Sequence, residues 1–118
     1  MRKDGLVFGD KNEQVIFNFS SFCEILKGCI SKYCNVSVQE ANDSVDRCEL
    51  FKSPIKNIND VYFFSHEHPF HWAMVCYYGD SYWEKNPELS NIPESFDDWE
   101  QGYISNNKLS KEVFAFSS

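Results

Sequence analysis

Residues 21–33, SFCEILKGCISKY, hold the most regular apolar pattern in the chain. The apolar positions recur every three or four residues, which places their side chains on one face of a helix. Ser21 followed by Glu24 forms a capping-box pattern, so an amphipathic helix is expected from here to about Asn35. Gly28 weakens helix propensity, and we expect it to mark close packing against a neighbour. The apolar face consists of Phe22, Ile25, Leu26, Cys29, Ile30 and Tyr33.

β-Branched and aromatic residues predict strands on both sides of this helix. Residues 15–19 and 112–116 have this composition, and the strongest strand predictions are the apolar runs 61–65 and 72–78. Only six residues, including Pro69, separate those two runs, so we expect an antiparallel hairpin. Its nearly continuous apolar character predicts central strands that are covered on both faces.

Shorter elements fill the remaining sequence. Short strands are expected at 36–38 and 48–51, on either side of a polar, turn-rich stretch at 39–46. Ser95 is expected to cap a short helix, because aromatic residues follow it at helical spacing and acidic residues lie in its first turn. The aromatic residues of that helix are Phe96, Trp99 and Tyr103.

These elements predict an α+β fold. We expect a single domain over residues 1–118, with a small antiparallel β-sheet, one main amphipathic helix and a short C-terminal-half helix packed on it. A chain of 118 residues with 42% hydrophobic and 17% aromatic residues can bury one core. It lacks a run of about 18 apolar residues and a signal-peptide core, so a cytoplasmic protein is expected.

The five cysteines are spaced irregularly and include no Cys-x-x-Cys pair. This spacing suits neither a disulfide framework nor a zinc knuckle, so we expect reduced thiols, several of them in the core. Cys76 is expected to be buried in the middle of a strand, where a thiol is inert. The five are Cys23, Cys29, Cys34, Cys48 and Cys76.

The net charge of −7 is concentrated in one segment. Residues 80–100 contain seven acidic residues and one basic residue, Lys85, so the rest of the chain is nearly neutral. A pI near 4.8 argues against direct binding to nucleic acid or to an anionic membrane, and it favours a basic partner. A solvated face that maintains solubility is the simpler interpretation of such a segment.

Aromatic residues lie among these acids, which favours a surface that captures a basic partner. Tyr82, Trp83 and Trp99 are the candidate anchors, and Trp83 is preferred as the exposed one. Phe96 and Tyr103 are expected in the core, whereas for Trp99 core and surface remain equally open. The candidate partner-binding residues are Asp80, Tyr82, Trp83, Glu84, Glu88, Glu94, Asp97, Asp98, Trp99 and Glu100.

All three histidines lie within His66-Glu67-His68-Pro69-Phe70-His71. Three imidazoles could form a zinc site with an open position, which would make the chain a small metal-dependent hydrolase. A polar hairpin turn is the preferred interpretation, because the spacing matches no metal signature and Pro69 leaves the geometry to a loop. With no glycine-rich phosphate loop and no activated nucleophile, we expect no catalytic residue, metal or cofactor.

The small size, reduced cysteines and acidic aromatic surface resemble the immunity proteins of bacterial contact-dependent growth inhibition and polymorphic-toxin systems. The residues that carry this resemblance are Tyr82-Trp83-Glu84 and Ser95-Phe96-Asp97-Asp98-Trp99-Glu100.

The resemblance implies a non-enzymatic inhibitor that forms a heterodimer with the C-terminal toxin domain of a cognate effector. That domain would be basic and a nuclease that cleaves RNA, and carboxylates that mimic phosphates would block its active site or substrate groove. The alternative from another class is an acidic regulatory subunit of some other complex, which would share the surface but not the toxin.

Overall fold

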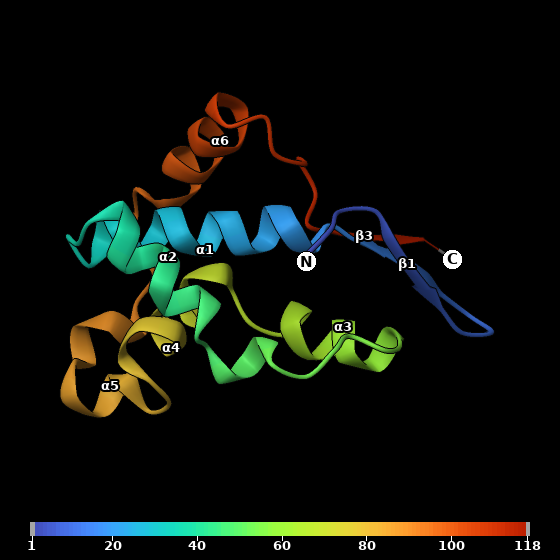
Figure 1. Ribbon diagram of the computed structural model, residues 1–118, viewed down its shortest axis with the longest axis horizontal. Coiled ribbons are helices and arrows are strands. Elements are labelled where there is room, and N and C mark those ends of the chain that lie inside the picture. The colour runs from blue at the N-terminus through green and yellow to red at the C-terminus, as the bar shows by residue number, and fades with distance from the viewer. Residues whose placement is uncertain (1, 118) are drawn as a thin grey trace.

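A computed structural model describes residues 2–117 and confirms the α+β class. Within this range a three-stranded antiparallel sheet lies at one end of the long helix α1, and the other helices pack around α1 and against the sheet (Figure 1). The strands are β1 (Leu6–Gly9), β2 (Gln14–Phe17) and β3 (Phe114–Ser117). The helices are α1 (Phe19–Tyr33), α2 (Val38–Asp46), η1 (Glu49–Phe51), α3 (Ile58–Ser65), α4 (Pro69–Tyr78), α5 (Tyr82–Lys85), η2 (Pro87–Ser90) and α6 (Phe96–Asn106).

Helix α1 is the centre of the fold, as its periodicity predicts. It contacts α2, α4 and α6, and the predicted apolar positions from Phe22 to Ile30 are completely buried. The predicted capping box is wrong, because the helix begins before it, with Asn18 as N-cap residue. Ser21 instead donates its backbone N–H and its hydroxyl to the Asp4 carboxylate, at 2.8 and 2.7 Å. Asp4, which lies outside the helix, therefore accepts hydrogen bonds from donors in the first turn of α1 that have no partner within the helix.

The sheet joins the two ends of the chain through β2. This central strand pairs with β1 (Val7 opposite Ile16) and with β3 (Val15 opposite Phe116). Phe17 is completely buried. Its ring stacks on the ring of Phe19 with centroids 5.0 Å apart and on the ring of Phe114 with centroids 5.1 Å apart. The predicted strands at 15–19 and 112–116 are thus confirmed, with ends displaced by one or two residues.

The predicted central hairpin is wrong, because residues 61–65 and 72–78 belong to helices α3 and α4. Asn57 and Asp60 form a capping box at the start of α3. His68 caps α4, and Pro69 occupies its first turn, where proline is favoured. Helix α4 is buried over consecutive residues, so it is apolar around its whole circumference and shows no helical period in the sequence.

Two further strand predictions are also wrong. Instead of a strand at 36–38 and turns at 39–46, residues 38–46 form helix α2. Its N-cap residue Ser37 accepts a hydrogen bond from the backbone N–H of Glu40 at 3.1 Å. The predicted strand at 48–51 contains the short 3₁₀ helix η1, and the loop after α5 contains a second one, η2. Ser95 is the N-cap residue of α6 as expected, but its side chain makes no capping hydrogen bond. No helix within residues 2–117 has the length and apolar content to cross a lipid bilayer.

Candidate functional site

The acidic–aromatic segment, residues 80–100, begins with a sharp turn after α4. Gly79 (φ 96°) and Ser81 (φ 63°) both adopt positive φ, which reverses the chain into the single turn of α5. Tyr82 points into the protein and is only 6% exposed, and its hydroxyl lies 3.0 Å from Nδ1 of His71. Trp83 is 43% exposed. The exposed position predicted for Trp83 is therefore confirmed. The side chain of Tyr82 instead packs in the protein interior and presents little surface to a partner.

Helix α6 attaches the other half of the segment to the core through Phe96. This ring is completely buried and packs on Tyr33, His68 and Phe70, as expected for a core residue. Trp99 is half-buried between Tyr33 and the ring of Tyr103, with which it stacks at 5.0 Å. Trp99 therefore fixes α6 on α1 and leaves part of its surface exposed.

The seven carboxylates of the segment differ from most other acids of the chain in having no partner. Within residues 2–117, none of them forms an ion pair or accepts a side-chain or capping hydrogen bond, whereas Asp43, Asp46 and Glu49 are each paired with a basic residue. Glu100 is half-buried. Burial is the larger cause that raises the pKa of its carboxyl, and the nearby negative charge of Asp97 raises this pKa further. The other six acids are exposed, and they are Asp80, Glu84, Glu88, Glu94, Asp97 and Asp98.

The three histidines are held apart by separate contacts. Nδ1 of His66 lies 2.9 Å from the carbonyl oxygen of Tyr62, and Nδ1 of His68 accepts the backbone N–H of Phe70 at 3.1 Å. Burial lowers the pKa of His68, and the charge of Asp97 opposes this effect. Across residues 2–117 no three His, Cys, Asp or Glu side chains are arranged to hold a metal ion.

The structure brings the histidine motif, residues 66–71, next to the acidic–aromatic segment. The sequence did not reveal this proximity. The ring of His71 stacks against Trp83 of α5, with centroids 6.3 Å apart and planes 28° apart. The ring of His68 meets Phe96 of α6 at 4.7 Å. In Figure 1, α5 and α6 lie on opposite sides of α1. The start of α4 therefore contacts both halves of the segment and fixes where each is placed.

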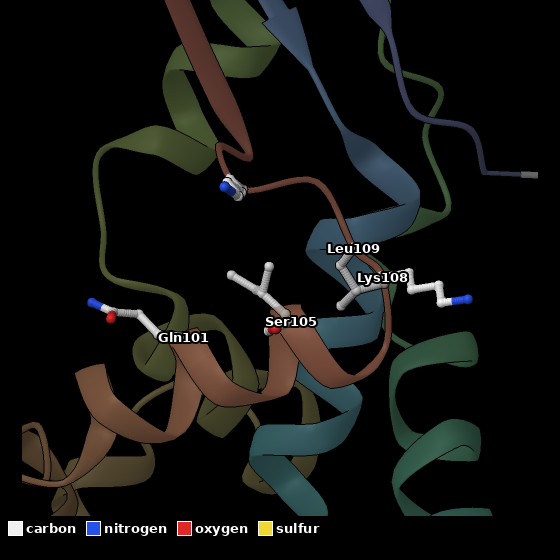
Figure 2. A pocket seen from close by; sticks show the side chains of 6 residues that line it. Gln101, Ser105, Lys108 and Leu109 are labelled. Carbon is white, nitrogen blue, oxygen red and sulfur yellow. The ribbon is translucent and has the colours of Figure 1, made fainter.

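Within residues 2–117, helix α6 helps to line three cavities, and two of them bear on possible catalysis. The first, of about 490 Å³, lies next to the histidine motif and is lined by His66, Glu67, His68 and Glu100 among others. The second, of about 500 Å³, lies between α6 and the loop that follows it, and is mostly apolar. Figure 2 shows Gln101, Ser105 and Leu109 around the second cavity, with the side chain of Lys108 extending away. Neither cavity is lined by a cysteine. The second cavity is also not lined by a histidine or a carboxylate, so its lining offers no general base.

Comparisons of this chain with protein-family models, with curated proteins and with solved structures each find no match.

Proposed function

We propose that this chain is a cytoplasmic immunity protein that binds the basic nuclease domain of a cognate toxin one to one. The observation that carries the proposal is the placement of unpaired negative charge. Six of the seven acids of residues 80–100 are exposed, and none of the seven has a partner within residues 2–117, whereas several acids elsewhere are paired with lysine or arginine. Such a local excess of one charge attracts an oppositely charged protein over distances of about 10 Å at ordinary salt.

The rigid aromatic residue within the acidic segment favours a docking surface over a solvated face. Trp83 is exposed, yet its ring is restrained by Tyr82 and by the stacked ring of His71. Tryptophan is enriched among the few residues that contribute most of the binding energy in protein interfaces. A side chain that is already ordered loses less conformational entropy on binding.

The proposed inhibition follows from these two features. Carboxylates in the first turn of α6, Asp97 and Asp98, would approach the basic residues that hold RNA phosphates in the toxin. Trp83 would then be buried against the toxin and slow its release. The bound inhibitor occludes the substrate groove, so no catalytic group is needed in this chain.

Binding kinetics with the basic C-terminal domain of an exported protein encoded beside this gene test the proposal. Asp97→Asn with Asp98→Asn should slow association about tenfold at low salt and weaken its salt dependence. The matched control is Asp43→Asn with Asp46→Asn, which removes the same charge from two ion-paired acids outside the segment. The control should associate like the parent chain.

Three results would contradict the proposal. Equal association rates for both double variants would place the interface elsewhere. A tight complex that leaves the nuclease active would remove the inhibitory role. Isolation of the chain in a stable complex with a non-toxic partner would instead indicate a regulatory subunit.

A further inference from the structure

Cys48 and Cys76 form a close thiol pair between two helical elements. Cys48 lies between α2 and η1, and Cys76 lies in the last turns of α4. Their sulfur atoms are 3.0 Å apart, with Cys76 donating to Cys48. In the part of the chain that the structure describes, no other thiol donates a hydrogen bond to a second thiol. A disulfide bond has a length of about 2.0 Å, so the sulfurs need to approach by only about 1 Å.

A small reagent can reach this pair from solvent. Both cysteines line an open cleft of about 430 Å³, together with Arg47, Glu49 and Gly79. At the cleft Cys48 is 8% exposed and Cys76 is half-buried, whereas Cys23 and Cys29 are enclosed in the core with at most 1% of their surface exposed. Contact with a solvent-filled cleft therefore distinguishes Cys48 and Cys76 from the core thiols Cys23 and Cys29.

The hydrogen bond also gives the two thiols different roles. The bond from Cys76, opposed by partial burial, lowers the pKa of Cys48. The same bond, followed by burial, raises the pKa of Cys76. Burial raises the pKa of Cys23 to about 12. Because the thiolate is the nucleophile, Cys48 is the thiol that reacts first.

We propose that Cys48 and Cys76 are a peroxide-sensitive modification site that closes to a reversible intramolecular disulfide. The Cys48 thiolate attacks one oxygen of hydrogen peroxide, the O–O bond breaks, and the released hydroxide takes a proton and leaves as water. Cys48 is now a sulfenic acid. The sulfur of Cys76 attacks that of Cys48, the S–O bond breaks, and the leaving hydroxide takes the Cys76 proton as a second water. Two thiols lose two electrons in total, and peroxide gains them.

The bond would restrain the chain on the side of α4 that leads into the acidic–aromatic segment. It closes a loop with a sequence separation of 28 residues, which contains η1 and α3. A crosslink across such a loop restricts the unfolded chain, so the oxidised form should unfold at a higher temperature. Formation of this disulfide does not require the proposed toxin partner.

Peroxide treatment of the full-length reduced chain, followed by intact-mass analysis and peptide mapping, tests the proposal. The expected product is a monomer that has lost two hydrogen atoms and links the Cys48 and Cys76 peptides. Its thermal transition should rise by roughly 5–15 °C and return to the original value with a dithiol reductant. Cys34→Ser, which removes a half-buried thiol outside the pair, should keep both the crosslink and the shift.

Cys76→Ser removes the attacking thiol of the second step, so Cys48 should gain oxygen atoms instead of forming a crosslink. An unchanged wild-type mass, a crosslink between another pair of cysteines, or oxygen addition without a crosslink would each overturn the proposal. These three readouts come from the wild-type chain and do not depend on how well either serine variant folds.

Discussion

The ring of Tyr103 in α6 occupies the space that a side chain at Gly28 in α1 would need. A Cβ atom on Gly28 would lie 2.7 Å from Cε1 and 2.8 Å from the hydroxyl oxygen of Tyr103. The close packing expected at Gly28 from its place in an apolar helix is thereby confirmed, and Tyr103 is the neighbour. Since Tyr103 also stacks on Trp99, this contact helps to position the acidic first turn of α6.

Gly28→Ala should therefore destabilise the protein even though alanine favours helix. The gain in helix propensity is about 1 kcal/mol, but the Tyr103 ring must leave its stacked position, and we expect a net loss of about 1–2 kcal/mol. Urea denaturation measures the free energy of unfolding of both chains.

A double-mutant cycle with Tyr103→Ala separates the steric contact from propensity. When the ring is absent, Gly28→Ala should become stabilising by up to about 1 kcal/mol. The same loss in both backgrounds would show that the Tyr103 contact does not determine the effect.

The sequence predicted elements that have one buried face and one exposed face. Helix α1 shows a clear period because only one side of it is in the core, and β2 and β3 have the expected β-branched and aromatic residues. The position of Trp83 on the surface and of Phe96 in the core could also be predicted, since one follows the end of an apolar run and the other begins a helix.

The helices α3 and α4 could not be identified from apolar spacing. Consecutive residues of α4 are buried, so its sequence has the continuous apolar character of a central strand. The local signals were the capping residues Asn57 and His68 and the proline after His68. The contact of His71 with Trp83 depends on the turn at Gly79 and Ser81, and no apolar pattern encodes that turn.

The indole of Trp72 joins these two helices through a buried hydrogen bond. Its Nε1 donates to the carbonyl oxygen of Phe64 at 2.8 Å, near the end of α3. Trp72→Phe leaves that carbonyl without its donor, and we expect a loss of about 1–3 kcal/mol in the free energy of unfolding. Trp83→Phe is the matched control, because Trp83 is exposed, and should change stability by about 0.5 kcal/mol at most. Similar losses from both substitutions in urea denaturation would rule out a special role for the Trp72 hydrogen bond.

Asp46 should contribute stability that depends on pH. Burial acts to raise the pKa of its carboxyl, but the hydrogen bond from Arg2 and the charge of Lys27 outweigh it and hold the pKa below the ordinary value of 3.8. Arg2 and Lys27 lie 2.9 and 3.4 Å from one carboxylate oxygen. Because the pKa is lower in the folded chain, the contribution is fully present above about pH 4 and is lost as the pH falls through the folded value.

Asp46→Asn measures this contribution. The difference in free energy of unfolding between parent and variant should be at most about 1 kcal/mol near neutral pH, because the carboxyl is half exposed. It should shrink towards zero as the pH falls through the folded pKa, since Asp46 is then protonated in both states. A difference that grows on acidification would have the wrong sign for a carboxylate stabilised by Arg2 and Lys27.

Trp83→Ala should mainly accelerate dissociation from the proposed toxin partner. The side chain is 43% exposed in the free protein, so its removal should cost less folding stability than the loss of a core aromatic residue, whereas the loss of an aromatic interface anchor costs about 2 kcal/mol or more in binding. That cost corresponds to a dissociation rate about 30-fold faster, with association altered much less. Trp99→Ala is not equivalent, because its contacts with Tyr33 and Tyr103 hold α6 in place. If Trp83→Ala left the dissociation rate unchanged while the Asp97 and Asp98 substitutions slowed association, the acids would attract the partner but the anchor would have to be another residue.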